Sequence, residues 1–313
     1  MSVFQFGVSK TGMFTITNRV INNVTCLLAG FLLTSSVIAH EEIGAPLWVS
    51  NVAQVQSDKE SDKNSSAFGL ENRLFQYLNS FFDPQFNLLN ANYRRTENVL
   101  DSYANACSGN KLKTEERLAK FPMTSFPQTI FLGQRLYVSS RVNPSSLEAY
   151  LTPNGAIQLE RLLKENKQLV LGLEDGRSYG DKADRVFEMP ENQPNIFIRH
   201  GDGTAQGVVE MWLADRIHML IEYPAVFKHY QSASEFKEIG FTSYPVEELE
   251  AFHAGYVMCS ATPQGKMLVK NVDEVIGVVS QQKVYLQLHL DYYSEDKHDE
   301  VTRLYNQVFN THF

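Results

Sequence analysis

Arg117 is the residue whose type and position could do chemistry most directly, within the segment CSGNKLKTEERLAKF (residues 107–121). A helix start led by Thr114 precedes it. A guanidinium is a planar fork of donors that matches a carboxylate with two parallel hydrogen bonds, each contributing about 1.5–3 kcal/mol net. A micromolar ligand needs about 8 kcal/mol in total. Two interpretations follow: a carboxylate-binding arginine, or a solvated helix face that Arg117 shares with Lys113 and Glu116.

A second polar pair, Ser178 and Tyr179, lies in the turn DGRSYG between a buried-type strand and a helix. Such a turn leaves backbone N–H groups free at the positive end of a helix dipole, which can hold an anion without catalysis. Ser178 stands between two glycines, but the G-x-S-x-G pattern of a nucleophile elbow is absent. The alternative is an exported α/β hydrolase-type enzyme with Ser178 or a carboxylate as catalyst, and the sequence offers it no recognisable base.

Histidines, cysteines and glycines do not form cofactor-binding patterns. The eight histidines are scattered, none belongs to the metalloprotease pattern, and no two cysteines have zinc spacing. The glycine loop GDGTAQG (residues 201–207) is one residue too long for a dinucleotide-binding fingerprint, and a polar turn capping a helix explains it. We therefore expect neither a metal nor another cofactor.

Composition describes a soluble globular protein. Hydrophobic residues make up 43% and charged residues 20% of the 313-residue chain, which suits one large or two small domains. The formal net charge of −8 argues against a protein that coats nucleic acid or anionic membrane. A local basic pocket is still compatible with that total.

The N-terminal segment predicts export. The run CLLAGFLLTSSVIA (residues 26–39) is apolar but shorter than the roughly 20 residues of a membrane span, and it ends in the small residues that a signal peptidase requires. Residues 1–39 are therefore expected to be a signal peptide, with an uncleaved anchor as the alternative and Met13 as a second candidate start. Cys107 and Cys259 would then meet an oxidising compartment, where a disulfide and two buried free thiols are both compatible with the sequence.

Apolar periodicity divides the remaining chain into alternating strands and helices. The expected strands are PLWVSN, FNLLNANY, the run QTIFLGQRLYVSS, QLVLGLE, NIFIRH, RIHMLIEY and AGYVMCSAT. The expected helices are GLENRLFQYLNSFF, RRTENVLDSYANA, the segment opened by Thr114, NGAIQLERLLKENK, TAQGVVEMWLA and the tail from Gly265 to Phe313. The alternation predicts α/β layers with largely parallel sheets, and SDKESDKNSS (residues 57–66) is expected to be a loop.

The order of these segments resembles the type II periplasmic solute-binding proteins, specifically the polar amino-acid (family 3) class, as a divergent member. The segments that carry the resemblance are GLENRLFQYL, SGNKLKTEERLAKFPMTS, LVLGLEDGRSYG, MWLADRIHMLIEYP and GYVMCSATPQGKMLVKNVDEVI. They cover almost the whole chain after the leader, and their order is the specific part.

The resemblance implies an α/β fold of two lobes, with lobe 2 inserted into a discontinuous lobe 1. Lobe 1 would comprise residues 40–139 and 252–313, the latter including the C-terminal helices, and lobe 2 residues 140–251. The chain would cross between the lobes near Tyr137–Val142 and Ala251–Ala254.

The resemblance also implies a ligand between the lobes. Arg117 would clamp an α-carboxylate, and the turn carrying Ser108 would face the cleft. The other expected contacts are Thr114, Ser178 and Tyr179, an aromatic residue at Trp48 or Phe68, and Glu222 or Tyr223 near an α-amino group.

The function so implied is capture of a small carboxylate-bearing, amino-acid-like ligand in the periplasm. The partner would be a membrane permease of the ABC transporter type or a sensor protein, with no nucleic acid, no catalysis and a monomeric chain. The rival to this and to the enzyme is a ligand-free signalling or interaction protein on the same scaffold.

Overall fold

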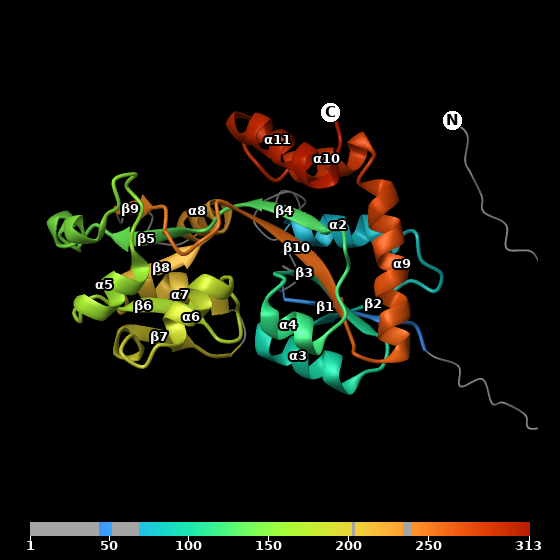
Figure 1. The fold of residues 1–313 in the computed structure, drawn as a ribbon, viewed down its shortest axis with the longest axis horizontal. Helices are drawn as coiled ribbons and strands as arrows, with labels where there is room; N and C mark the ends of the chain where they lie inside the picture. The colour runs from blue at the N-terminus through green and yellow to red at the C-terminus, as the bar shows by residue number, and fades with distance from the viewer. Residues whose placement is uncertain (1–43, 52–68, 202–203, 234–239) are drawn as a thin grey trace, which may run out of the picture. The chain divides into compact units, whose positions relative to one another are not determined.

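The structure, a computed structural model, describes residues 44–51, 69–201, 204–233 and 240–313. The expected signal peptide, the loop at residues 57–66 and Phe68 lie outside the described residues. Two five-stranded sheets organise the rest (Figure 1), and the units built on them are called the first and second lobes.

The first sheet has the strand order β2-β1-β3-β10-β4. Its strands are β1 (Leu47–Ser50), β2 (Asn87–Asn90), β3 (Ala106–Lys111), β4 (Thr129–Leu132) and β10 (Phe252–Cys259). Strands β1, β2 and β3 are parallel, whereas β10 is antiparallel to both β3 and β4.

The second sheet has the order β7-β6-β8-β5-β9. Its strands are β5 (Arg135–Ser139), β6 (Leu171–Glu174), β7 (Ile196–Arg199), β8 (Met219–Glu222) and β9 (Phe241–Tyr244). Strands β6, β7 and β8 are parallel, and β5 is antiparallel to β8 and β9. Both sheets are therefore mixed rather than largely parallel, because the strands that arrive from the other lobe run against the parallel ones.

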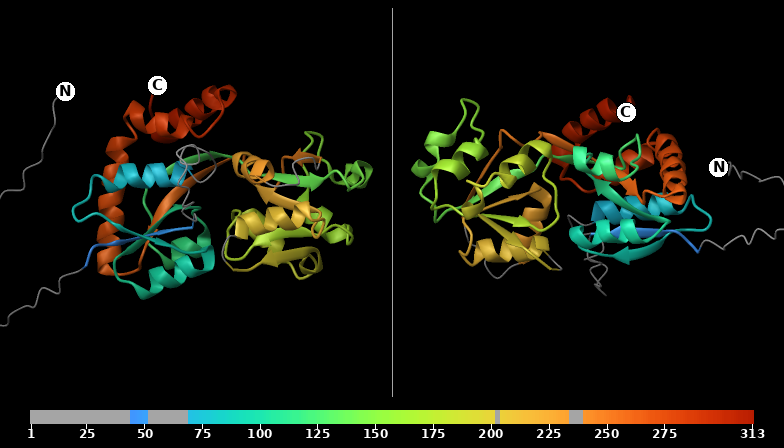
Figure 2. Two further views of the ribbon diagram at one scale, coloured as in Figure 1. Left: turned by 180° about the vertical axis from the view of Figure 1, so that it is seen from behind. Right: turned by 60° about the horizontal axis from the view of Figure 1, so that its bottom comes forward.

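Helices cover both sheets, and Figure 2 gives two further views of their arrangement. Those of the first lobe are α2 (Gly69–Asn79), α3 (Tyr93–Ser102), α4 (Glu115–Lys120), α9 (Pro263–Val279), α10 (Lys283–Leu290) and α11 (His298–Phe309). Those of the second lobe are α5 (Leu159–Glu165), α6 (Asp181–Glu188), α7 (Thr204–Leu213) and α8 (Pro224–Ala233). In the described parts of the chain, no helix is both long and apolar enough to span a membrane.

The chain crosses between the sheets twice, at neighbouring positions. The outward crossing lies between the end of β4 at Leu132 and the start of β5 at Arg135, earlier than the expected Tyr137–Val142. Gly133 N–H donates to the carbonyl of Ala251 at 2.8 Å, so the return crossing runs beside it. A Cβ at position 133 would lie 2.5 Å from a backbone oxygen of the return segment, so the close approach requires this glycine.

Each lobe has its own apolar core. In the first lobe, Trp48 packs among side chains of α2, β10 and the C-terminal helices, and Tyr285 of α10 donates its hydroxyl to the Gln128 carbonyl at 2.8 Å. The tail consists of helices joined by turns with no strand, as expected, and it belongs to the first lobe. In the second lobe, the core includes Leu171 of β6 and Met219 of β8.

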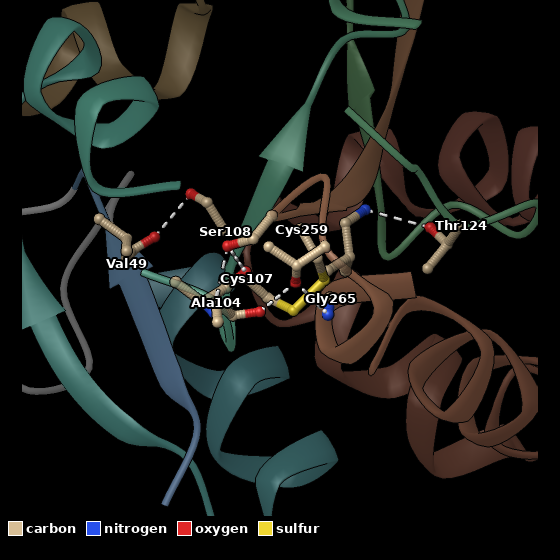
Figure 3. The surroundings of a disulfide bond; sticks show 11 residues. Val49, Ala104, Cys107, Ser108, Thr124, Cys259 and Gly265 are labelled. Atoms are coloured by element: carbon tan, nitrogen blue, oxygen red, sulfur yellow. Dashed lines mark hydrogen bonds between the residues drawn. A yellow bond between two sulfur atoms is a disulfide. The ribbon is translucent and has the colours of Figure 1, made fainter. Parts of the chain in front are cut away.

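Cys107 and Cys259 form a disulfide between β3 and β10, at directly opposed positions of the antiparallel pair. The expected polar turn at residues 108–110 is instead part of β3. Ser108 is fully buried and donates its hydroxyl to the carbonyl of Val49 at 2.6 Å (Figure 3). These polar residues can extend the strand because the neighbouring strand satisfies the Ser108 hydroxyl.

Candidate functional site

A cavity of about 610 Å³ is lined by both lobes. The first lobe contributes α3, Thr114 and α4, and the second contributes the end of β6, the turn after it and α6. The volume lies within the roughly 300–1,000 Å³ of small-molecule sites. Its lining includes Tyr93, Glu97, Thr114, Arg117, Arg177, Ser178, Tyr179 and Asp184.

Arg117 lies on the cavity wall with only 7% of its surface exposed. Thr114 caps α4 by accepting a hydrogen bond from the Arg117 backbone N–H at 3.2 Å, which fixes the first turn of the helix. Arg117 Nη1 donates to the Leu112 carbonyl at 3.3 Å, and Nε lies 3.7 Å from a carboxylate oxygen of Glu97. Toward the described residues, Arg117 therefore uses a minority of its five donors.

The turn DGRSYG supplies the opposite wall. Gly176 and Gly180 have positive φ values of 72° and 103°, which bend the chain sharply between β6 and α6. Asp184, in α6, accepts hydrogen bonds from the Ser178 hydroxyl and, at 2.8 Å, from the Tyr179 N–H. The helix thus holds the turn through one carboxylate.

A buried ion-pair cluster lies beneath this turn. Arg177 donates Nη1 and Nη2 to the two carboxylate oxygens of Glu222, at 2.7 and 2.8 Å, and Nη1 also contacts Glu174. The Arg177 guanidinium lies over the rings of Tyr179 and Tyr223, 5.0 and 5.6 Å from their centroids. Sequence reasoning missed Arg177. The available signal was its spacing, three residues after the acidic end of a buried strand.

Lys111 of the first lobe contacts Tyr93, a residue of the cavity wall. Its side chain is buried, its Nζ donates to the Asn51 carboxamide, and the same nitrogen is 5.2 Å from the centroid of the Tyr93 ring. Burial lowers the pKa of Lys111 to about 7, and the nearby Glu71 carboxylate opposes that change. Tyr93 itself lines the cavity, so its ring contacts both the buried amine and the cavity.

Four of the expected contact residues line the cavity: Thr114, Arg117, Ser178 and Tyr179. Tyr179, an expected ligand contact, offers the cavity very little exposed surface. Its ring is 2% exposed and packs edge-on against Phe187, and its hydroxyl accepts from the Glu174 N–H at 3.2 Å. It belongs mainly to the second-lobe core.

Of the other expected residues, the structure describes Ser108, Trp48, Glu222 and Tyr223, and none of these four lines this cavity. Ser108 and Trp48 are buried within the first lobe, where the indole packs against Phe75. Glu222 is 3% exposed and paired with Arg177, and Tyr223 packs against aromatic neighbours from the first lobe.

Metal binding finds no support in the described residues, since no group of three or more His, Cys, Asp or Glu side chains there is arranged to hold an ion. The charged side chains facing the cavity are of both signs. Its acidic members are Glu97, Glu115, Glu116, Glu174, Asp175, Asp181, Asp184 and Glu188, and its basic members are Arg94, Arg117, Lys120, Arg177 and Arg185.

No protein-family model matches this chain, and no curated protein sequence matches it significantly. Solved structures do match. A histidine kinase sensor domain with similarity to periplasmic binding proteins superposes with a TM-score of 0.58 at 10% identity, covering 80% of this chain and 96% of that one.

Two transport proteins give similar values. A putative L-cystine ABC transporter protein from Listeria monocytogenes matches with a TM-score of 0.56 at 15% identity, covering 80% of this chain and 97% of that one. An arginine transport-system periplasmic binding protein from Legionella pneumophila matches at 0.54 and 13% identity, with 80% and 100% covered. The identities limit the likeness to architecture: the chain has the two-lobed mixed α/β fold of the type II periplasmic binding proteins, at great sequence divergence.

Proposed function

We propose that the protein is an exported solute-binding protein, which captures a small amino-acid-like ligand between its lobes for an ABC transporter or a sensor. Binding involves no covalent chemistry, and the periplasm is the compartment in which such a protein acts. Structural neighbours that are amino-acid transport proteins and a sensor domain support this class. The partner is then a membrane permease or a sensor protein.

The observation that carries the proposal is the position of Arg117. A nearly buried guanidinium faces a cavity of about 610 Å³, with most of its donors unused by the described residues. A buried charged donor that keeps free hydrogen-bonding capacity is suited to a carboxylate, which takes two parallel bonds from one guanidinium.

The cavity's mixed charges favour a ligand that also carries a positive group. Carboxylates outnumber basic side chains along its wall, so a simple anion would meet net repulsion there. A zwitterion places its carboxylate on Arg117 and its cationic group among the acidic residues.

Two hydrogen bonds between the lobes support closure around the ligand. The Glu115 N–H of α4 donates to the Asp181 carboxylate of α6 at 3.3 Å. The side-chain amide of Asn92 in the first lobe donates to the Gly201 carbonyl of the second at 3.4 Å. A ligand that contacts both walls would add to these bonds and favour the closed population.

The test is a thermal-shift screen of amino acids, small carboxylates and polyamines, followed by calorimetry on each stabiliser. Arg117→Ala should weaken binding by about 100-fold, as expected from losing about 3 kcal/mol of charge-assisted hydrogen bonding. Arg117→Lys, which keeps the charge without the fork, should recover only part of the affinity. Arg95→Ala, at an exposed position of α3, is the control and should bind as wild type.

Three outcomes would contradict the proposal. The first is a folded wild-type protein that no compound of the screen stabilises. The second is an Arg117→Ala variant with unchanged affinity, and the third is turnover of a bound compound, which would indicate an enzyme.

A further inference from the structure

The carboxylates of the cavity wall differ in whether they form an ion pair with a basic side chain. Glu174 and Glu222 contact Arg177, and Glu97 pairs with Arg117 and Lys120. Asp175 lies 3.0 Å from a ring nitrogen of His200, and Asp181 accepts the Glu115 N–H of the other lobe. The remaining acidic residues, Glu115, Glu116 and Glu188, are exposed.

Two half-buried carboxylates of the described cavity wall form no ion pair: Asp181, which accepts a hydrogen bond from the other lobe, and Asp184, which accepts hydrogen bonds only from its own lobe. Asp184 is the one of the two whose bonds all come from the second lobe. It is half-buried and forms no ion pair with a described basic residue. Each of its oxygens accepts one hydrogen bond, from the Ser178 hydroxyl and from the Tyr179 N–H. Because an ionised carboxylate has about four acceptor positions, both oxygens keep capacity for a further donor.

Asp184 also interacts electrostatically with Arg117. Burial raises the pKa of the Asp184 carboxyl, and the Arg117 guanidinium of the other lobe is among the groups that oppose that rise. A charge from the first lobe therefore acts on a carboxylate of the second. Both residues line the same cavity, so it presents one positive and one negative group, from opposite lobes.

Glu222, the acidic residue at the end of β8, cannot play this part. Both its oxygens are bonded to the Arg177 fork, and Oε1 also accepts the Tyr223 N–H at 2.7 Å. Arg177 is itself in cation–π contact with two tyrosine rings. A ligand ammonium would have to displace a buried, bidentate guanidinium to reach it.

We propose that Asp184 binds the ammonium group of an α-amino acid whose carboxylate is bound by Arg117, while Arg177 withholds Glu174 and Glu222 from the ligand. This deepens the proposed function and rests on it. The two charges of the ligand are thereby divided between the lobes, so both lobes must close to recognise both groups. Selectivity for the amine depends on α6 rather than on the end of β8.

The test uses the standard L-amino acids, each paired with the carboxylic acid of the same carbon skeleton that lacks the α-amino group. Affinities of both members are measured by calorimetry at pH 7. Wild-type protein should prefer the amino acid of a binding pair by at least about tenfold, or about 1.4 kcal/mol. Asp184→Asn should lose that preference and still bind the carboxylic acid.

Asp184→Ser removes the same charge with a smaller side chain and provides a second measurement if the amide variant does not fold. Glu188→Gln is the matched control: it removes an exposed carboxylate from the same cavity and helix, one turn further on, and should keep the preference.

A preference that persists in the charge-removed variants overturns the assignment of Asp184. If Arg117→Ala still weakens binding by about 100-fold in that case, the proposed function stands without the inference. If neither member of any pair binds wild-type protein, the proposed function fails and the inference fails with it.

Discussion

Gly176 of the second lobe lies directly against the backbone of Arg94 in the first. A Cβ at position 176 would stand 2.8 Å from the Arg94 nitrogen and 3.1 Å from its Cα. Side chains do not tolerate contacts this close, so the two lobes can approach here only because residue 176 has none. The glycine also has a φ of 72°.

Gly176→Ala is therefore expected to hold the lobes apart. Gly155→Ala is the matched control, because Gly155 has a similar φ of 77° in the same lobe but nothing within 4 Å of its would-be Cβ. Both variants should lose about 1–2 kcal/mol from the strained backbone. Only Gly176→Ala should also enlarge the radius of gyration by small-angle scattering and weaken ligand binding. Equal scattering and affinity in the two variants would contradict this reading.

The disulfide should contribute strongly to stability, because it closes a long loop with a sequence separation of 152 residues. Replacing Cys107 and Cys259 together by Ala should lower the free energy of unfolding by about 2–5 kcal/mol. Urea denaturation with and without dithiothreitol measures this. Reductant should shift the wild-type midpoint and leave the double variant unchanged. A wild-type urea midpoint that does not change on complete reduction would show that the disulfide is dispensable for stability.

Arg177→Met should destabilise the second lobe by about 3–5 kcal/mol, because it deprives two buried carboxylates of their guanidinium. Adding Glu174→Gln and Glu222→Gln to the same chain removes the uncompensated charge and should restore part of the loss. Chemical denaturation of the single and triple variants gives both values. A triple variant less stable than the single one would contradict the electrostatic explanation.

Acid should weaken the fold through His289. The ring is fully buried, and burial lowers the pKa of His289 from 6.5 to about 4 despite a hydrogen bond to the Tyr285 carbonyl. The unfolded chain takes up a proton below about pH 6.5, whereas the native ring does so only near pH 4. Stability should therefore fall by about 3 kcal/mol as pH drops across that window and then level off.

His289→Phe isolates this effect, because it keeps an aromatic ring and removes the titration. Its free energy of unfolding should change less between pH 6.5 and 4 than that of wild type. His253, whose pKa burial also lowers to about 4, remains in both proteins, so the difference between the two slopes belongs to position 289. Identical slopes would be evidence against the assignment.

The sequence revealed most of the elements because their apolar patterns are strong. The runs that became β1, β6 and β8 are nearly continuous apolar stretches, and α2 buries one face with helical spacing. The apolar run at residues 128–140 predicts β structure but not its division between two sheets at Gly133, since apolar content does not specify a strand's partner. Strand β9 is short, partly polar and largely exposed, so it has no periodic signal.

The site could be anticipated only where its geometry is local. Thr114 and Arg117 are three residues apart, and the cap that joins them follows from helix chemistry. Arg177 and Glu222 are 45 residues apart, so their ion pair cannot be deduced from local sequence. That ion pair determines which carboxylates remain available to a ligand. Asp184 belongs to a polar stretch of sequence that resembles several others in the chain. Only its position on α6 at the cavity distinguishes it from other acidic residues.

The bond between β3 and β10 has a topological consequence. It turns the chain from Cys107 to Cys259 into a covalent ring that includes every strand of the second lobe. A protease that nicks any single peptide within this ring leaves one molecule of unchanged mass apart from the added water. A single proteolytic cleavage therefore cannot release the second lobe while the disulfide is intact.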